Sequence, residues 1–512
     1  MPSTQTIELR PKGINYDIPP SEVSTEEYTY GENILFRNGF AEKARGWEQV
    51  FPDPTFEPQY LLNVTTSSAN YWVVGADDGI YVTDSVAWFD ITPASFVAPT
   101  ELNQWTGGVL NGIPVLNNGQ GAPWYWDLNT GNVMLDIPDW PANTTCGFIR
   151  PFKFHLIAGN ITNVSGNFPN QIVWSSAAEP GGIPQEWTPT PSNDAGDVQL
   201  SSTPVPVIDG GPLRDAFMVY KQHSTFELKY VGGTFVYASR KVFASSGILA
   251  RNCVVEFEGS QFVFTDGDII KTDGQNFVSL ISRRAKQSLF AVIDPDTFPY
   301  SYVALNRPDN EIMFCLPANP SPVPNLALVY NTRFDTLGLR VIGECAHINW
   351  GNVSVAGTDS SWSGLVGTWA DQVGAWTQSR FNSADDGLVM ANTEFQKIYE
   401  LDSSIDQDGE PAPWILRRGY LDFGMPSTNK TLTRVWPRCQ AQNEGVINLR
   451  VGGTETTEES VQWLPPIPFD PNTQRYVDVI TVGKFLSFEF SGDTGQIVLT
   501  GFDVELMESG RY

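Results

Sequence analysis

Residues 71–84 read YWVVGADDGIYVTD, and this stretch is the clearest guide to the fold. Two short runs of apolar and aromatic residues flank the turn residues Asp77-Asp78-Gly79. Such runs, bounded by Asp and Gly, are typical of β-strands, and an Asp-Gly pair between alternating strands is the strongest short-range signal for a hairpin. The stretch therefore predicts two antiparallel strands joined by a tight turn.

Four further segments share this shape of strand, polar turn and second strand. They are residues 217–230 (FMVYKQHSTFELKY), 262–273 (FVFTDGDIIKTD), 327–339 (ALVYNTRFDTLGL) and 388–402 (LVMANTEFQKIYELD). Together with tryptophan-rich connectors such as residues 124–126 (WYW), this loose repetition predicts the degenerate blades of a β-propeller. A β-sandwich or several small β-domains would fit the same pattern.

The composition favours an all-β chain. The 512 residues include 45 Gly and 37 Pro, which suits many short strands joined by tight turns. Residues 279–293 (SLISRRAKQSLFAVI) are the exception, because Ile281, Ala285 and Leu289 recur at helical spacing. Asp294-Pro295 predicts the end of that helix.

A change in composition near residues 406–413 (DQDGEPAP) indicates a domain boundary. Beyond it, cleaner alternation predicts the strands of an antiparallel, sandwich-like β-platform in residues 414–423, 446–451, 485–490 and 497–506. The first fifty or so residues lack the repeated shape. We therefore expect an N-terminal segment of the platform in residues 1–58, a propeller with insertions in residues 59–405 and a C-terminal platform domain in residues 406–512.

The charge argues against a protein that grips nucleic acid. With 58 acidic and 31 basic residues the formal charge is −27, whereas DNA-gripping proteins carry a basic stripe that displaces phosphate counterions. The densest basic points are Arg283-Arg284 with Lys286, and Arg417-Arg418. A solvated face or a subunit contact explains them better than phosphate binding. Either no nucleic acid is involved, or DNA passes nearby without adhering.

Motifs of common enzyme classes are missing from the sequence. It has no G-x-S-x-G, H-E-x-x-H, G-x-x-x-x-G-K-[ST] or G-x-G-x-x-G pattern, and its three histidines, His155, His223 and His347, are isolated among strand-like residues. We therefore expect no enzyme and assign no catalytic, cofactor-binding or metal-binding residue. Carboxylate pairs for glycoside hydrolysis stay open, because sequence gives no separations between them.

Asp-rich turns offer oxygen atoms that calcium prefers, at residues 77–78, 194–197, 266–268 and 406–408. None has the twelve-residue loop with a terminal Glu, and turn chemistry alone explains these aspartates. The cysteines are odd in number and contain no C-x-x-C pair, which predicts buried free thiols at Cys146, Cys253, Cys315, Cys345 and Cys439.

Targeting signals are also missing. The N-terminal residues MPSTQTIELRPKG contain no apolar run of the signal-peptide kind, and no stretch approaches the roughly 18 apolar residues of a membrane span. We expect a protein that is made in a cytosol and stays soluble there.

One segment resembles a known family. Residues 13–47, GINYDIPPSEVSTEEYTYGENILFRNGFAEKARGW, are similar to the amino terminus of the tail-nozzle, or packaged-DNA-stabilisation, proteins of short-tailed, podovirus-type bacteriophages. In that family a Pro- and Ser-containing stretch precedes an aromatic residue, an Asn-x-x-Phe-Arg-x-Gly turn, a basic residue, and Gly with an aromatic. The matching features are residues 19–21, Tyr30, residues 33–39 and residues 43–47. Residues 243–264, and residues 172–175 (IVWS) ahead of residues 184–187, resemble later family segments. By itself, Asn38-Gly39 predicts a hairpin with a type I′ turn.

The resemblance implies a structural virion protein. It implies a propeller with a β-platform, assembled as a homohexamer below the portal and the adaptor (head-to-tail connector) ring in the virion tail. Such a ring retains packaged dsDNA and conducts it at ejection without tight binding, and tail fibre, spike or needle proteins are further partners. The acidic balance fits that conduit, because a negative wall repels phosphates.

A receptor-recognition tail protein that binds or depolymerises carbohydrate is the alternative function. Sixteen tryptophans could stack on sugars, but tryptophan also serves as a blade-core residue.

Overall fold

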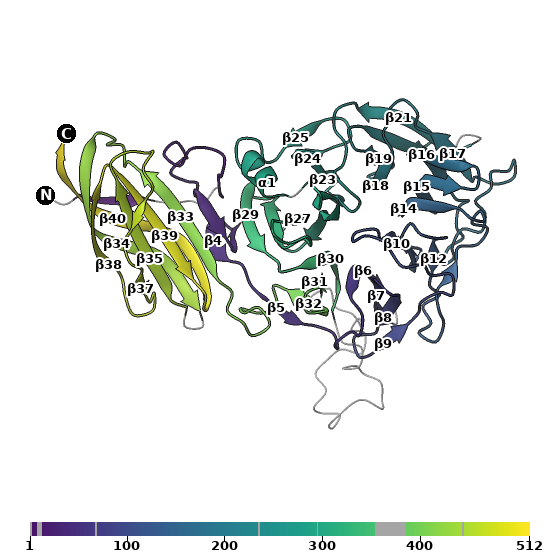
Figure 1. The fold of residues 1–512 in the computed structure, drawn as a ribbon, viewed down its shortest axis with the longest axis horizontal. Helices are drawn as coiled ribbons and strands as arrows, with labels where there is room; N and C mark the ends of the chain where they lie inside the picture. The colour runs from purple at the N-terminus through teal and green to yellow at the C-terminus, as the bar shows by residue number, and fades with distance from the viewer. Residues whose placement is uncertain are drawn as a thin grey trace, which may run out of the picture.

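The computed structural model describes residues 3–7, 13–66, 69–233, 236–293, 295–353, 386–442 and 445–511. Strands account for 52% and helix for 2%, which confirms the all-β prediction. A propeller forms one end of the molecule and a platform of long strands the other (Figure 1). The fold is thus the predicted propeller with an added antiparallel β-platform.

The described residues form seven propeller blades, each a four-stranded antiparallel arrangement. The strands of the first three blades are β6 (Pro58–Thr65), β7 (Asn70–Ala76), β8 (Ile80–Thr83) and β9 (Trp88–Asp90); β10 (Thr106–Leu110), β11 (Ile113–Asn117), β12 (Trp124–Tyr125) and β13 (Leu135–Asp136); and β14 (Thr145–Phe152), β15 (His155–Asn163), β16 (Gly166–Trp174) and β17 (Gly196–Gln199).

The strands of the next three blades are β18 (Val207–Leu213), β19 (Ala216–Lys221), β20 (Thr225–Tyr230) and β21 (Tyr237–Phe243); β22 (Val254–Phe257), β23 (Ser260–Thr265), β24 (Asp268–Thr272) and β25 (Phe277–Ser279); and β26 (Tyr302–Asn306), β27 (Glu311–Leu316), β28 (Leu326–Asn331) and β29 (Thr336–Val341). The seventh blade contains β30 (Cys345–Asn352), β31 (Asp386–Asn392) and β32 (Lys397–Leu401).

The innermost strands contact one another in chain order, β6, β10, β14, β18, β22, β26 and β30, and β30 then contacts β6. The fourth strand of the seventh blade comes from the N-terminal part of the chain. There β5 (Trp47–Gln49) pairs with β32, so that Trp47 lies opposite Leu401 and Gln49 opposite Tyr399. This pairing closes the ring between the two ends of the propeller segment. It also corrects the expected boundary after residue 58, because the propeller already includes residues 47–49.

Tryptophan side chains fill the core of the first blades. Trp72, Trp105, Trp124 and Trp126 are at most 1% exposed, so they serve as core residues. Gly75 on β7 makes room for one of them, since a Cβ at Gly75 would lie 2.6 Å from the Trp105 ring.

The platform consists of two sheets that face each other across an apolar core. One contains β2 (Tyr30–Glu32), β33 (Trp414–Leu421), β39 (Phe485–Gly492), β35 (Ile447–Thr454), β36 (Gln462–Trp463) and β37 (Ile467–Phe469). The other contains β1 (Ser3–Ile7), β40 (Gln496–Arg511), β34 (Thr428–Gln442) and β38 (Val477–Gly483). Between them Phe488 and Phe490 pack against Phe502 of the opposite sheet.

A β-hairpin joins the propeller to the platform by pairing with a strand of each. Strands β3 (Ile34–Arg37) and β4 (Phe40–Lys43) pair with each other, β3 pairs with β29 of the sixth blade, and β4 pairs with β40 of the platform. One continuous sheet therefore runs from the sixth blade through β3 and β4 to β40 of the platform. In Figure 1, β4 lies between the propeller and the platform.

All five hairpins that the sequence predicted are present: β7–β8, β19–β20, β23–β24, β28–β29 and β31–β32. The Asn38-Gly39 hairpin is confirmed as well. Both residues have positive φ, 53° and 79°, as a type I′ turn requires.

The predicted helix is shorter than expected. Residues 279–293 were expected to be helical throughout, whereas α1 spans Lys286–Val292. Arg283 has a φ of 59°, in the left-handed region, so the chain before α1 turns and does not continue the helix. The expected stop at Asp294 lies outside the described residues. No described helix is long and apolar enough to cross a membrane.

Candidate functional site

Asn33 begins the family-like turn and connects the propeller to the platform. Its side-chain oxygen accepts a hydrogen bond from the Val341 N–H of the sixth blade at 2.8 Å, and its side-chain nitrogen donates to the Pro413 carbonyl at 2.7 Å. The residue is 5% exposed and has a φ of 54°, a conformation that Asn tolerates better than most residues. One amide thus bridges both parts of the molecule.

Arg37 forms a second connection between the β3–β4 hairpin and the propeller. Its guanidinium donates to both carboxylate oxygens of Glu311, at 2.8 and 2.7 Å, and lies 3.1 Å from Asp309 and 3.7 Å from Asp402. Arg340 pairs with Asp402 at 2.9 Å. Burial raises the pKa of Glu311, and Arg37 partly offsets that effect. Burial also opposes ionisation of Asp402, but Arg340 and Arg37 lower its pKa below the ordinary value.

Lys43 and Gly46 make further contacts where the propeller meets the platform. The Lys43 ammonium is buried and donates to the carbonyl of Gly495 at 3.0 Å, with the Ile405 carbonyl at 3.4 Å. Burial lowers the pKa of Lys43, although Asp406 and Asp493 oppose the shift. A Cβ on Gly46 would lie 1.7 Å from the Asp406 carbonyl oxygen, so a larger residue would separate the two segments. We name Asn33, Arg37, Lys43 and Gly46 with their partners the joint.

The basic points of the sequence lie on two elements and do not form one patch. Arg284 pairs with Asp335 at 3.1 Å, and Lys286 with Asp268 at 3.0 Å, while Arg283 is exposed. In the platform, Arg417 pairs with Glu489. Arg418 is buried and donates to backbone carbonyls of the N-terminal segment, including Pro20 at 2.9 Å and Val23 at 2.7 Å. Most of these basic side chains therefore pair with carboxylates or backbone carbonyls of the same chain.

The histidines lie apart. His155 and His347 are buried in different blades, and His223 is exposed. Burial lowers the pKa of His347 to about 3, and the nearby Arg150 adds to that shift. The neutral ring accepts a hydrogen bond from the Leu61 N–H at 3.3 Å.

The Asp-rich turns also lie apart, and their aspartates serve local contacts. Asp77 and Asp78 are exposed in a hairpin turn, and Asp408 accepts from Lys397 at 3.1 Å. Within the described ranges, no group of three or more His, Cys, Asp or Glu side chains is placed to hold a metal ion. All five cysteines are free; four are buried as predicted, and Cys439 is partly buried.

Inner strands of the blades line an axial cavity of about 390 Å³ that is open to solvent. Arg150 reaches into it and donates to Asp209 at 3.0 and 2.7 Å and to Asn252 at 2.7 Å. Asn252 in turn donates to Asn103 at 2.7 Å. This network joins blades two to five across the axis, so side chains occupy the middle of the propeller.

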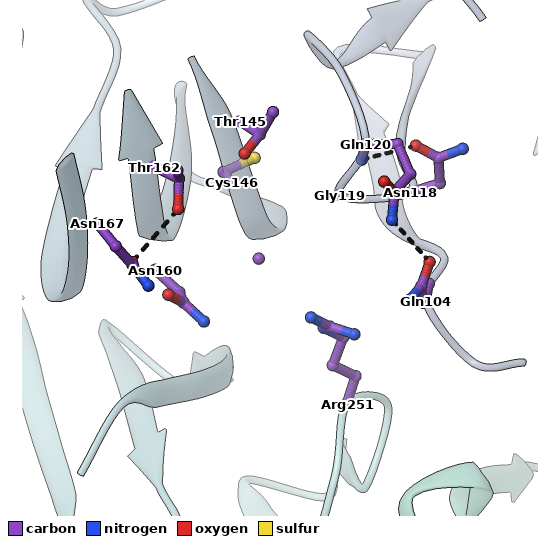
Figure 2. Close-up of a pocket in the computed structure, with 11 residues that line it drawn as sticks. Gln104, Asn118, Gly119, Gln120, Thr145, Cys146, Asn160, Thr162, Asn167 and Arg251 are labelled. Atoms are coloured by element: carbon purple, nitrogen blue, oxygen red, sulfur yellow. Dashed lines mark hydrogen bonds between the residues drawn. The ribbon is translucent and has the colours of Figure 1, made fainter. Parts of the chain in front are cut away.

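A separate polar pocket of about 220 Å³ lies between blades two and three (Figure 2). Arg251, from the connector before β22, points into it from one side toward Cys146 on β14 (Figure 2). Asn160, Thr162 and Asn167 of β15 and β16 form one wall, and the opposite wall consists of Gln104, Asn118, Gly119 and Gln120 (Figure 2). Burial raises the pKa of the Cys146 thiol, which therefore stays protonated.

Sequence reasoning missed both the joint contacts and this pocket. The joint residues lie within the segment that resembles the nozzle family, so their pattern was visible although their partners were not. Nothing in the sequence around Arg251 (ILARNC) sets it apart, and its pocket partners lie between residues 104 and 167.

Neither a family model nor a curated protein matches this chain. Solved structures with similar folds include the β-propeller domain of Cps50 (Swd1) from Myceliophteria thermophila, at 10% identity and a TM-score of 0.40, covering 70% of this chain and 100% of that one. Another is the WD40 β-propeller domain of Doa1, at 8% identity and a TM-score of 0.39, covering 70% and 96%. This chain is a β-propeller protein that carries an antiparallel β-platform on its sixth blade.

Proposed function

We propose that this chain is a structural subunit of a phage tail nozzle. Copies of it would form a closed ring, expected to be a homohexamer, below the portal and adaptor rings. The ring retains packaged DNA and conducts it at ejection. The observation that carries the proposal is that the family-like residues 33–47 form the joint, so the resemblance falls on residues that set the architecture.

The contacts of the joint would make the connection between propeller and platform rigid, as the wall of a DNA-retaining ring requires. A continuous sheet, an amide bridge and buried ion pairs connect the sixth blade to the platform. Packed elements of this kind resist small deformations, because protein interiors have low compressibility.

The axial cavity supports a conduit made by several copies. Its volume of about 390 Å³ is crossed by the Arg150–Asp209 network. A sphere of that volume is about 9 Å across, less than the width of the DNA major groove alone, about 12 Å. Duplex DNA therefore has no path through one propeller, and a lumen requires a ring of subunits.

The platform offers an apolar face to a second copy. Strand β38 is the last strand of its sheet, and Ile480 and Val482 on it are 74% and 51% exposed. Val482 on β38 is the cross-strand partner of Thr431 on β34. Thr431 also pairs with Met507 on β40, and Met507 is 43% exposed. An exposed apolar row beside a strand edge that pairs with no further described strand is typical of a protein–protein contact. We name Ile480, Val482 and Met507 the platform edge patch.

Charge supports passage without adhesion. A net charge of −27 repels phosphates, and four of the five residues at the dense basic points are engaged by carboxylates or backbone carbonyls. A mobility-shift titration with duplex DNA at low salt tests this. We expect no binding at submicromolar protein, and any weak binding should vanish as salt rises. Submicromolar binding would contradict the conduit and favour a DNA clamp.

A further inference from the structure

The polar pocket contains side-chain groups that have no partner of their own. The Arg251 guanidinium makes no hydrogen bond or ion pair with any described residue, and neither does the Asn160 amide or the Thr145 hydroxyl. By contrast, Arg150 on β14 donates hydrogen bonds to Asp209 and Asn252. Burial lowers the pKa of Arg251, and the charges of Asp209 and Glu101 oppose that shift without forming an ion pair with it. A partly buried guanidinium without a direct hydrogen-bond acceptor is costly, because burial removes water that would solvate it.

Arg251 determines the charge of the ligand. It is the single ionised group among the pocket-lining residues, and the other lining side chains are amides, hydroxyls and the protonated Cys146 thiol. One guanidinium balances one negative charge, and its planar fork matches a carboxylate in a bidentate arrangement. A doubly charged phosphate would leave an uncompensated charge in the pocket.

The walls determine the rest of the ligand. The free Thr145 and Asn160 groups can donate and accept. The amides of Gln104, Asn118, Gln120 and Asn167 each already make at least one hydrogen bond within the chain, for example to Thr100, Val97 and Thr162, and can add a bond only with their remaining atoms. No aliphatic or aromatic side chain lines the pocket. A hydroxyl-rich ligand would satisfy such walls, whereas an apolar acid would bury its hydrocarbon against polar groups. The volume of about 220 Å³ is below the usual range of about 300–1,000 Å³ for drug-sized ligands, so the ligand is a single small unit.

We propose that this pocket binds an acidic monosaccharide unit, a hexuronate, with its carboxylate on Arg251 and its hydroxyls on Asn160, Thr145 and the facing amides. The unit can be a free sugar or a residue of an acidic polysaccharide. The inference rests on the pocket alone and does not depend on the proposed ring.

Isothermal titration calorimetry on the full chain at low salt tests the proposal. The probes are sodium glucuronate, sodium galacturonate, glucose, acetate and inorganic phosphate, followed by a galacturonate oligomer to separate free sugar from polysaccharide. At least one uronate should bind, and neither glucose nor acetate should match it. Arg251→Met should weaken uronate binding about tenfold or more, because a charge-assisted pair is lost.

Two variants complete the design. Asn160 has a φ of 57°, so Asn160→Gly removes the amide without backbone strain and should also weaken binding. Arg283→Met removes an exposed arginine outside the pocket and should leave binding unchanged. Thermal unfolding of each variant checks that it folds. The proposal is overturned if no uronate binds, if acetate or phosphate binds as tightly as uronate, or if folded Arg251→Met binds uronate like the unaltered protein.

Discussion

Arg37 donates two hydrogen bonds to the carboxylate of Glu311, across 274 positions of sequence, and so connects the β3–β4 hairpin to the sixth blade. The Glu311 side chain is 2% exposed. Removing one partner of a buried pair leaves an uncompensated charge, which costs about 3–5 kcal/mol. Arg37→Met should therefore destabilise the protein by that order.

A double-mutant cycle in urea unfolding measures this effect. Because Glu311→Gln removes the stranded charge, the double variant should be more stable than Arg37→Met alone. Additive costs of the two substitutions would show that the pair is not coupled.

The backbone conformation of Asn33 and its two bridging hydrogen bonds contribute separately to the stability of the folded protein. Asn33→Gly loses the bonds to Val341 and Pro413 but tolerates a φ of 54°, whereas Asn33→Ala loses the bonds and is strained as well. We expect Ala to cost about 1 kcal/mol more than Gly in chemical unfolding. Equal stability of the two variants would mean that the backbone conformation is not maintained.

Gly46 permits a close approach of backbone to backbone. The substitution Gly46→Ala would place a Cβ 1.7 Å from the Asp406 carbonyl oxygen and should cost about 2 kcal/mol or more. Gly121→Ala is the matched control, because its nearest neighbour would lie at 3.8 Å, and it should change stability by less than about 0.5 kcal/mol. Thermal unfolding of both variants decides the matter, and similar melting temperatures would rule out the close contact.

His347 should make the propeller sensitive to acid. Its pKa falls from an ordinary 6.5 to about 3 on folding, so between these values the unfolded chain binds the proton and the folded chain does not. Stability from this residue is complete above about pH 6.5 and is lost as pH falls toward 3, at about 1.4 kcal/mol per pH unit. His347→Asn keeps an acceptor for the Leu61 N–H and removes the titration.

The measurement is the unfolding free energy of both proteins from pH 7 to pH 4. The unaltered protein should lose more stability than His347→Asn over this range, while His223→Asn, at an exposed position, should behave like the unaltered protein. Parallel curves for His347→Asn and the unaltered chain would contradict the assignment.

The platform edge patch should affect assembly without affecting folding. Ile480→Lys changes a side chain that is 74% exposed, so the stability of the monomer should change by less than about 0.5 kcal/mol. If the patch contacts a second copy, this lysine should reduce incorporation of the chain into tails. Val164→Lys, at an 80% exposed position on the propeller, is the control. Equal incorporation of both variants would remove the patch from the interface.

Local features of the fold were predictable from the sequence. Hairpins such as β7–β8 and β23–β24 follow from turn residues and alternation within fifteen positions. Pairings between distant segments were not. Strand β5 completes the seventh blade by pairing with β32, where Trp47 lies opposite Leu401. A strand of three residues is too short to show an alternating pattern, so the sequence did not predict it. Strand β34 was missed because it includes Pro437, which is tolerated where β38 no longer pairs alongside it.

Neither the joint nor the pocket was predicted from the sequence. The joint residues lie in the segment that resembles the nozzle family, but the sequence did not indicate their partners. The pocket depends on how blades two and three face the Arg251 connector. A lone arginine in an apolar run gives no sign that its guanidinium lacks a partner.

Cryo-electron microscopy of tail complexes from particles that encode this chain is the decisive experiment for the nozzle role. We expect six copies in a closed ring around the DNA axis, each with its propeller and platform joined through residues 33–47 and with an acidic lumen. A tail that lacks this chain, or carries it as separate appendages away from the DNA axis, would rule out the nozzle role.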